Sequence, residues 1–496
     1  MQYYSTRDRS LRMNAAEAIK RGLSRDGGLL TPCEIPQINQ IFLQELIPLS
    51  YQERAARVMS LYLTDYTLDE LRKFAKNAYG PEKFDAPEAA PLHCLDETTF
   101  CLELWHGPTS AFKDMALQML PQLLSAALRK TGEDKTACIL VATSGDTGKA
   151  AMEGFADVPQ TKILVFYPKD GVSAVQEQQM VTQDGKNVGV CAVVGNFDDA
   201  QAGVKRIFSD EAIRETLAKK GFFLSSANSI NWGRILPQVV YYISAYCDLL
   251  KENRITMGEK INFCVPTGNF GDILAAYYAK RMGLPVGKLL CASNRNNVLT
   301  DFLRTGIYDR NRPFYATESP SMDILVSSNL ERLLFDLSGE NDAEVRGYME
   351  ALAKDGRYQV SDDIRKALQE QFWGGFCDAE GTAKTIAHYY EDYGYLMDTH
   401  TAVAANVMEQ YRAATGDNQT CTVFASTASP FKFCGSVLTA IGETPAGDGV
   451  ALLDQLHEVT GAAVPRRLAA LRGKQRRFDE TCEKAGMDSV VLNFLR

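Results

Sequence analysis

The sequence lacks the patterns that mark metal, redox and membrane proteins. None of its 12 cysteines forms a Cys-x-x-Cys pair, so neither a zinc ribbon nor a dithiol redox motif is supported. Its five histidines show no His-x-x-x-His spacing, which leaves a metalloprotease without support. No apolar run approaches the length of a transmembrane helix. Metal-dependent and membrane-embedded functions are therefore not expected.

Positive charge and an apolar signal core are also missing. The formal net charge is -9, whereas a general nucleic-acid binder usually carries a basic face. Residues 1–10 carry charges and have no apolar core, so no secretory signal is predicted there. Several cysteines lie inside apolar runs, where a free thiol acts as a small hydrophobic group in a reducing compartment. These features predict a cytoplasmic protein with no nucleic-acid, metal or membrane partner.

What the sequence does contain is a regular alternation of strand and helix patterns. The apolar, β-branched runs show little polar alternation, as expected for strands of a parallel sheet that is covered on both faces. They lie at Ala137–Ala142, Ile163–Tyr167, Val188–Val194, Ile261–Val265, Lys288–Ala292 and Thr420–Ala425. Segments of helical spacing separate these runs. Strand–helix–strand order predicts an α/β protein built on parallel sheets.

Two segments show where predicted helices begin or end. Ile273–Met282 is closed by Gly283, a typical C-cap. Met115–Lys130 contains Pro121, which should kink or split the helix.

The length of 496 residues favours several domains. We expect a mainly helical N-terminal domain over 1–95. Residues 96–330 should form cofactor and substrate αβα domains, with a smaller domain at about 110–230 inserted. Residues 331–496 should supply a helical segment and complete the large cofactor domain.

The strongest local signal is the turn Val265-Pro-Thr-Gly-Asn-Phe-Gly-Asp272, which leaves a predicted strand and opens a helix. Gly268 and Gly271 allow the backbone to approach a ligand closely. The first amides of the helix point outward at the positive end of its dipole, which suits an anion such as phosphate. Such turns also occur without any ligand. The spacing matches neither the Walker nor the dinucleotide motif, so a nucleotide function gains no support.

A second strand-to-helix turn is Ala142-Thr-Ser-Gly-Asp-Thr-Gly-Lys149. Thr143, Ser144 and Thr147 place hydroxyls beside a helix that we expect to begin near Lys149. Several donors at one point suit a carboxylate ligand. The alternative is a capped helix start with no ligand.

Lys113 lies between Phe112 and Met115, at the start of an apolar helix. A lysine on an apolar surface can lose pKa and become a nucleophilic amine, although most lysines at helix starts are solvated. A turn that can hold an anion (the anion cradle, 265–272), a turn that can hold a carboxylate (142–149) and a reactive lysine are together the parts that a pyridoxal phosphate enzyme needs.

These motifs carry a specific resemblance. His106-Gly-Pro-Thr-Ser-Ala-Phe-Lys113-Asp, Ser144-Gly-Asp-Thr-Gly148 and Pro266-Thr-Gly-Asn-Phe-Gly-Asp272 resemble the cofactor-lysine, substrate and cofactor-phosphate motifs of the threonine synthase family, in its long form. Further similar runs are Asn228–Arg234, Ser319–Arg332, Asp398–Thr401 and Ser426–Phe433. Two positions depart from the family pattern: Asp8 stands where members often have Gly, and Ser429 where many have His. Any role that relatives give to that histidine is in doubt here.

The resemblance implies a fold type II pyridoxal 5'-phosphate enzyme of the tryptophan synthase β kind. It implies that Lys113 binds the cofactor covalently and that Gly268, Asn269, Phe270, Gly271 and Asp272 hold its phosphate. By the same resemblance Asp146 lies near the oxygen of the cofactor ring and Thr427 meets its pyridine nitrogen. Thr143, Ser144 and Thr147 are expected to hold the substrate carboxylate.

The implied reaction converts O-phospho-L-homoserine and water into L-threonine and phosphate. Lys113, once displaced by the substrate amine, would act as general base while Cα and Cβ lose protons, phosphate leaves Cγ and water adds at Cβ. Asn231 and Arg234 are the residues we expect at the departing phosphate, with Lys149 as a weaker candidate. Arg234 could instead form a structural salt bridge, and His106 is expected to be a satisfied buried histidine.

Other functions remain open on this scaffold. They are a serine or threonine dehydratase, a cysteine synthase, a phospholyase similar to threonine synthase, or a non-catalytic sensor of amino acids or phosphate. The long N-terminal domain, together with the Asn228-Ser-Ile-Asn-Trp run, favours threonine synthase. We expect a monomer or a homodimer.

Overall fold

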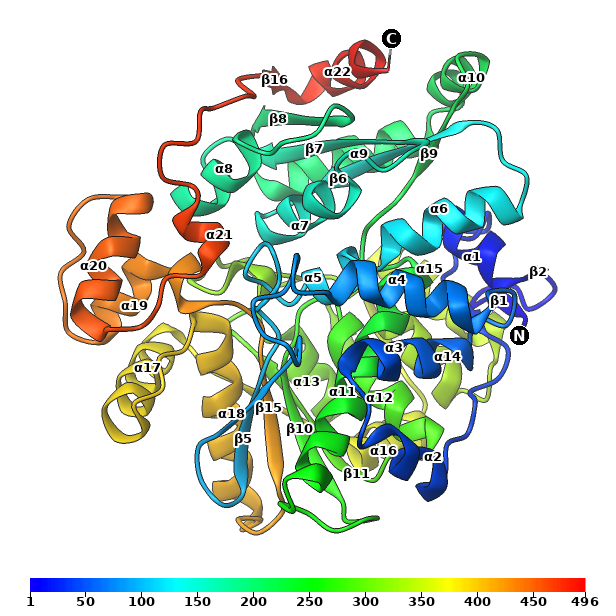
Figure 1. Cartoon of the computed structure of the whole chain (residues 1–496). Coiled ribbons are helices and arrows are strands. Elements are labelled where there is room, and N and C mark those ends of the chain that lie inside the picture. Colours follow the sequence, from blue (N-terminus) through cyan, green and yellow to red (C-terminus); the bar gives the residue numbers. More distant parts are fainter. Residues whose placement is uncertain (496) are drawn as a thin grey trace.

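Two parallel sheets, each covered by helices, build the body of the molecule. The computed structural model describes residues 1–495, apart from the side chain of residue 198. Figure 1 shows the smaller sheet above the larger one, with the N-terminal helices packed beside the large domain. The two α/β layers predicted from the apolar runs are confirmed.

The larger sheet has the strand order β14-β11-β10-β15-β5-β4. Its strands are parallel except for the antiparallel edge strand β4. Their bounds are β4 Leu92–Cys94, β5 Thr99–Glu103, β10 Ile261–Pro266, β11 Val286–Ser293, β14 Phe372–Phe376 and β15 Thr422–Ser426. The parallel strands end at one edge of the sheet, where ligands usually bind in such folds.

The smaller sheet has the order β16-β8-β7-β6-β9, and all its strands are parallel. Their bounds are β6 Thr136–Ala142, β7 Thr161–Pro168, β8 Val188–Val194, β9 Phe222–Ser225 and β16 Thr481–Glu483. The helices that follow these strands are α7 Asp146–Phe155, α8 Ala174–Val181, α9 Phe197–Ser209 and α10 Glu211–Lys219. All six strands predicted from the sequence are present in the two sheets.

The N-terminal region combines short strands with helices. The strands β1 Tyr3–Ser5, β2 Arg12–Met13 and β3 Leu30–Pro32 form an antiparallel sheet. The helices are α1 Ala15–Arg21, α2 Gln40–Leu46, α3 Tyr51–Ser60 and α4 Leu68–Tyr79. Asn14 caps α1 by accepting from Glu17 N. Their apolar faces join the core of the large domain, around Trp232 of α11 (Trp232–Lys251).

The remaining helices surround the large sheet and the cleft. They are α12 Gly271–Met282, α13 Val298–Thr305, α14 Leu330–Leu337, α15 Asp342–Asp355, α16 Asp362–Gln371, α17 Ala379–Tyr393, α18 Thr399–Thr415, α19 Cys434–Ala440, α20 Val450–Thr460, α21 Arg466–Ala469 and α22 Met487–Phe494. Short 3-10 turns lie at η1 Pro320–Met322, η2 Pro430–Lys432 and η3 Lys484–Gly486, and β12 Ile307–Asp309 pairs with β13 Arg357–Gln359.

The two helix-end predictions are confirmed. Gly283, with φ 110°, ends α12. The predicted helix over 115–130 is split into α5 (Asp114–Leu117) and α6 (Leu120–Lys130), with Pro121 in the first turn of α6. A proline there costs no intrahelical hydrogen bond, since the first amides of a helix have no partner within it.

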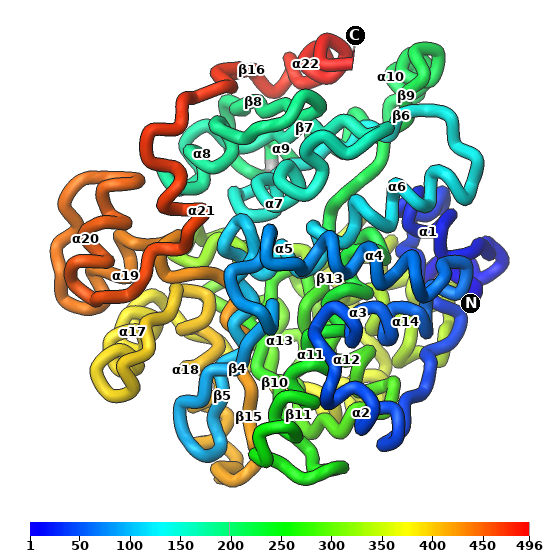
Figure 2. The backbone as a smooth tube through the Cα atoms, in the orientation of Figure 1, coloured from blue at the N-terminus to red at the C-terminus, as the bar shows by residue number. Residues whose placement is uncertain are grey.

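The C-terminal region departs from the prediction in two places. Residues 331–496 were expected to complete the large domain, but β16 pairs with β8, and α22 packs on the smaller sheet. The tube in Figure 2 shows the chain crossing from α20 past α21 to the smaller sheet. Residues 331–496 were also expected to supply a helical segment, yet that part of the chain contains the strand β14, which pairs with β11. The five residues of β14 include two glycines and lie among charged helices, so their strand character is weak in the sequence.

The described residues contain neither a helix that could cross a membrane nor a group of side chains that could hold a metal ion. No helix among them has the length and apolarity that crossing a membrane requires. Within that same part of the chain, His, Cys, Asp and Glu side chains do not gather in threes at any point where a metal ion would fit.

Candidate active site

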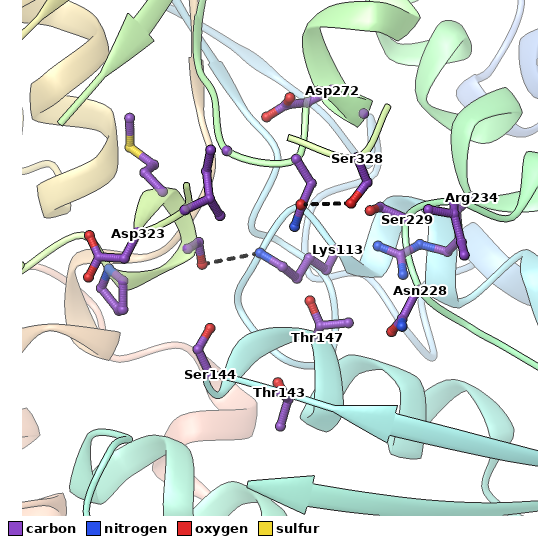
Figure 3. A pocket seen from close by; sticks show the side chains of 18 of the residues that line it. Lys113, Thr143, Ser144, Thr147, Asn228, Ser229, Arg234, Asp272, Asp323 and Ser328 are labelled. Atoms are coloured by element: carbon purple, nitrogen blue, oxygen red, sulfur yellow. Dashed lines mark hydrogen bonds between the residues drawn. The ribbon is translucent and has the colours of Figure 1, made fainter. Parts of the chain in front are cut away.

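A cavity of about 240 Å³ lies between the two sheets and collects most of the predicted site residues. Figure 3 shows Lys113 near its centre, with Ser144, Thr143 and Thr147 on one side and Asp272 and Ser328 on the other. The predicted residues that line it are Lys113, Thr143, Ser144, Thr147, Arg234, Gly268, Asn269, Gly271, Asp272 and Thr427. Phe270, Asp146, Lys149 and Asn231 are not among its lining residues.

Lys113 presents a free amine to this cavity. It precedes α5, and its Nζ donates a hydrogen bond to Ser321 Oγ at 3.2 Å. Burial lowers its pKa to about 8, while the carboxylate of Asp146 acts in the opposite direction. A larger fraction of Lys113 is therefore neutral near physiological pH than for a solvated lysine, and a neutral amine can act as nucleophile or base.

The glycine turn at the start of α12 lies open toward the cavity. Phe270 is its N-cap in a left-handed conformation, with φ 62°, and offers no side-chain hydrogen bond to the first amides. A Cβ on Gly268 would lie 2.5 Å from the carbonyl oxygen of Ser321, so only glycine fits there. Ser327 Oγ and the Asn329 side chain hold the turn by donating to the carbonyls of Gly268 and Asn269. Ile273 N donates to the Asp272 carboxylate at 2.9 Å, and the amides of the turn before it are left to an external anion.

The second turn has its own internal acceptor. Thr143 Oγ1 accepts from the backbone amides of Gly145 and Gly148 at 3.0 and 2.9 Å. Gly145 has φ 127°, a conformation that favours glycine. Ser144 and Thr147 are half-buried and face the cavity, so they are the hydroxyls that remain for a ligand. The helix begins at Asp146 and not near Lys149 as predicted, because Thr143 satisfies the first turn.

Asp146 joins the two domains. Its Oδ1 lies 2.6 Å from Lys432 Nζ, and both side chains are almost fully buried. Gln176 donates to the same oxygen at 2.9 Å. Despite the cost of burial, the ammonium groups of Lys432 and Lys113 hold the pKa of Asp146 well below its usual range. The structure thus directs Asp146 toward Lys432, a partner that the sequence did not indicate.

Three predicted phosphate-binding residues occupy different environments. Arg234 is buried at the cavity wall, where burial lowers its pKa to about 10. Its Nη1 donates to Ala227 O, but its Nε has no hydrogen-bond partner, and no carboxylate pairs with it among the described side chains. Asn231 instead caps α11 and donates to Ile19 O. Lys149 pairs with Glu153. Of the three, only Arg234 is available to a ligand.

Two other expectations concern single residues. Thr427 follows β15 at the cavity, and its carbonyl accepts from Phe112 N at 2.7 Å. Thr427 lines the same cavity as Lys113. His106 Nε2 lies 2.7 Å from Glu103 Oε2 and is satisfied outside the cavity lining, as expected.

Several lining residues received no role from the sequence. They are Asn228, Ser229, Gln238, Ser321, Asp323, Ser328 and His400. Most fall within the runs Asn228–Arg234, Ser319–Arg332 and Asp398–Thr401, which carried the family resemblance. The clustering of these runs was therefore a usable signal, although their contacts with Lys113 were not readable.

Three family models match consecutive parts of the chain. They are "Threonine synthase N terminus" over 2–79, "Pyridoxal-phosphate dependent enzyme" over 84–426 and "Threonine synthase, C-terminal" over 401–490. The second model covers the residues that contribute both glycine turns and Lys113.

Curated relatives and solved structures agree with these matches. A threonine synthase of Pseudomonas aeruginosa is 40% identical over 90% of this chain and 92% of its own. Human threonine synthase-like 1 is 39% identical over 86% of this chain. The matched part makes up only 58% of the length of that human protein. The crystal structure of PLP-bound threonine synthase from Brucella melitensis superposes with a TM-score of 0.88 at 36% identity, covering both chains fully. The yeast enzyme gives 0.88 at 34% identity, with 99% of this chain and 98% of that chain covered. The chain belongs to the threonine synthase family of pyridoxal-phosphate-dependent enzymes.

Proposed function

We propose that this protein is a threonine synthase, which converts O-phospho-L-homoserine and water into L-threonine and phosphate. The observation that carries the proposal is the position of the Lys113 amine between an open anion cradle and a buried guanidinium, that of Arg234, which has no carboxylate partner among the described side chains. Two anion-binding sites, one on each side of a reactive amine, match a phosphorylated cofactor and a phosphorylated substrate.

The residues of the cavity fit pyridoxal phosphate. The turn 268–271 would hold its phosphate, because the first amides of α12 lack a side-chain cap and Gly268 leaves room for close approach. Thr427 would meet its ring nitrogen as a hydroxyl. When bound, the cofactor supplies an electron sink for charge that develops on substrate carbons.

Lys113 would bind the cofactor and move protons. Its amine is held by Ser321 Oγ at 3.2 Å and has a pKa of about 8, close to the value at which a general base works well. The amine is positioned to take the proton from Cα of the substrate and to return a proton later.

The substrate would be held at its two ends. Ser144 and Thr147 are free to donate to its carboxylate, beside the N-terminus of α7. Arg234 would receive the phosphate, because a guanidinium matches phosphate oxygens with paired donors. Asn228 and Ser229 line the same wall. Lys205, on α9, is an exposed cation at the edge of the cavity.

A second candidate is a phospholyase that releases phosphate without making threonine. Human threonine synthase-like 1 and the bacterial threonine synthase match this chain at nearly the same identity, so the degree of identity alone does not fix the product. Both reactions use the same cavity and the same first proton transfer. The predicted cytoplasmic location and monomeric or homodimeric state stay predictions.

A product assay separates the candidates. The purified protein, loaded with pyridoxal phosphate, is incubated with O-phospho-L-homoserine, and threonine, 2-oxobutyrate and phosphate are each quantified. Threonine and phosphate in equal amounts support the proposal. Phosphate with 2-oxobutyrate in place of threonine supports the phospholyase, and no phosphate release contradicts both.

An Arg234→Met variant tests the phosphate end. We expect KM for O-phosphohomoserine to rise by about 10- to 100-fold, since a charge-assisted bond contributes roughly 1.5–3 kcal/mol. Arg54→Met is the matched control, because Arg54 is also buried but bonds to Leu46 O, Ser244 and Asp248, none of which lines the cavity. It should lower stability without a selective change in KM.

A further inference from the structure

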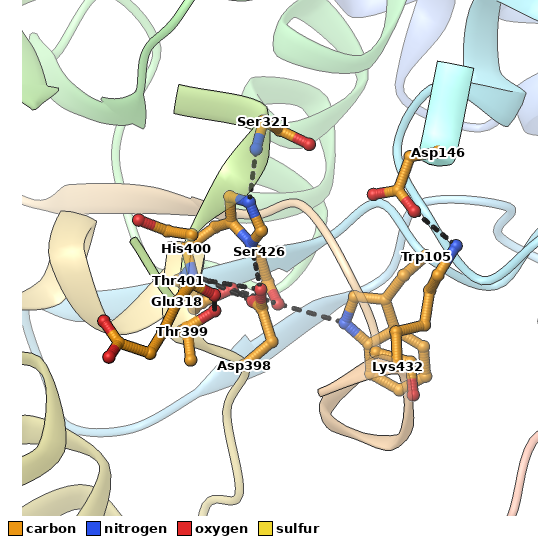
Figure 4. A network of polar contacts seen from close by, with 12 residues as sticks. Trp105, Asp146, Glu318, Ser321, Asp398, Thr399, His400, Thr401, Ser426 and Lys432 are labelled. Carbon is orange, nitrogen blue, oxygen red and sulfur yellow. Dashed lines mark hydrogen bonds and ion pairs between the residues drawn. The ribbon is translucent and has the colours of Figure 1, made fainter. Parts of the chain in front are cut away.

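A chain of polar contacts runs from the start of α18 through His400 and Ser321 to the Lys113 amine. It begins at Asp398, the fully buried N-cap of α18. Asp398 Oδ2 accepts from the His400 amide at 2.9 Å and lies 2.7 Å from His400 Nδ1. Its Oδ1 accepts from the Thr401 amide at 3.0 Å and from the Thr401 hydroxyl. Figure 4 shows these contacts converging on one carboxylate.

The next contact defines the protonation pattern of the imidazole. His400 Nε2 lies 3.2 Å from the backbone nitrogen of Ser321, which can only donate. Nε2 must therefore be the unprotonated acceptor, and Nδ1 carries the proton that it donates to Asp398. The ring is 2% exposed and lies 5.0 Å from the Phe433 ring, so its orientation is fixed by packing as well.

Ser321 then connects the imidazole to the reactive amine. Its Oγ accepts from Lys113 Nζ, while its amide donates to His400. It lies on the 3-10 turn η1, and its carbonyl faces Gly268 of the anion cradle. One serine thus touches the imidazole, the amine and the glycine turn.

The neighbouring segment is anchored from the same helix end. Thr399 Oγ1 donates to Glu318 O at 2.6 Å. The segment 318–321 is therefore held at two points by α18, which packs against the large sheet. A fixed serine hydroxyl restricts the directions in which a flexible lysine can place its amine.

We propose that His400, held by Asp398 with its proton on Nδ1, is a positioning residue that fixes Ser321 and, through it, the free amine of Lys113. The inference rests on the proposed function of Lys113 as the base that moves substrate protons. His400 itself exchanges no proton with the substrate in this assignment. Its effect reaches the reaction only through the position of Lys113 Nζ.

The test compares His400→Leu, which removes the acceptor, with His400→Gln, which can restore it through Oε1. In the holoenzyme we expect His400→Leu to lower kcat by about 10- to 100-fold, as misplaced catalytic groups do, with KM changed by less than about 2-fold. Deuterium at Cα of the substrate should give a larger isotope effect in this variant. His400→Gln should recover kcat to within about 5-fold of the original protein.

Hydrogen exchange provides a readout that is independent of turnover. The Ser321 amide should exchange faster in His400→Leu and regain its protection in His400→Gln. His388→Gln is the matched control, because His388 Nδ1 also lies 2.7 Å from a carboxylate, that of Asp392, but on the exposed face of α17. It should change none of these quantities. Ser321→Ala should lower kcat with KM preserved, whatever the folding of the leucine variant.

Two results would overturn the inference. One is normal kcat in Ser321→Ala or in a folded His400→Leu protein. The other is a kcat in His400→Gln as low as in the leucine variant although protection of the Ser321 amide has returned. If the unsubstituted protein itself releases no phosphate from O-phosphohomoserine, the proposed function fails instead, and the exchange data then report on the contact alone.

Discussion

The two strand-to-helix turns that face each other across the cavity look alike in sequence but differ in what they leave free. In the turn after β6, Thr143 occupies the amides of Gly145 and Gly148, and Asp146 pairs with Lys432. In the turn after β10, the N-cap Phe270 gives the amides no side-chain acceptor, although the Asp272 carboxylate accepts from the amide of Ile273. The first turn therefore offers hydroxyls to a ligand, and the second offers backbone amides. A turn binds an anion through its backbone only where its own side chains do not already use those amides.

The largest effect is expected at Lys113, which lies between the two turns. Lys113→Ala should lower kcat by about 10³-fold or more, because both cofactor attachment and proton transfer are lost. Absorbance near roughly 410–420 nm, typical of the lysine-bound cofactor, should also disappear. The melting temperature should not fall, since removing a buried ammonium relieves a desolvation cost. Full turnover in this variant would contradict the proposed roles of Lys113 in cofactor attachment and proton transfer.

The glycine turn after β10 is tested by Gly268→Ala. The added Cβ would lie 2.5 Å from Ser321 O, so the cradle must shift. We expect the Kd for pyridoxal phosphate to rise by about 10- to 100-fold, equivalent to the roughly 1–3 kcal/mol of overpacking. Equilibrium titration of the cofactor-free protein measures it. Gly347→Ala, on α15 with nothing within 4 Å of the new Cβ, is the control and should leave Kd unchanged.

The turn after β6 is tested by Ser144→Ala. KM for O-phosphohomoserine should rise about 10-fold, while the cofactor Kd stays the same, because a hydroxyl-to-carboxylate bond is lost only to the substrate. Thr143→Ala should behave differently. It leaves two buried amides without an acceptor, so thermal unfolding should show a loss of about 1–3 kcal/mol. An equal rise in KM in both variants would contradict the assignment of the Ser144 hydroxyl to the substrate and of the Thr143 hydroxyl to the amides of the turn.

The smallest effect concerns pH. Only the neutral amine attacks the cofactor aldehyde, and burial lowers the pKa of Lys113 to about 8. The rate of cofactor attachment to the cofactor-free protein should therefore rise with pH, by about 5-fold between roughly pH 7 and 8, and level off above pH 9. Stopped-flow absorbance would follow it. A rate that still climbs nearly tenfold per pH unit around roughly pH 9 would mean that the lysine is solvated.

Much of the fold was readable because its signals are local. A buried parallel strand, the turn that follows it and the next helix are contiguous, so the runs before Thr143 and Gly268 could be recognised from a few residues each. The same locality made Lys113 and the glycine turn recognisable as family motifs. Weak strands were missed where the signal was short, as in β14, or where the partner was distant, as in β16 on the smaller sheet.

The sequence by itself determined the strand-turn-helix units and the chemical types gathered at their ends, because these depend on neighbouring residues. Only the tertiary structure decided which groups remain free. Ser321 reaches Lys113 across 208 residues and His400 across 79. Asp146 is paired with Lys432, and Arg234 is left with an unpartnered Nε. The hydrogen-bond capacity of a buried group is divided among whatever the fold brings within about 3 Å, and no local pattern records that division.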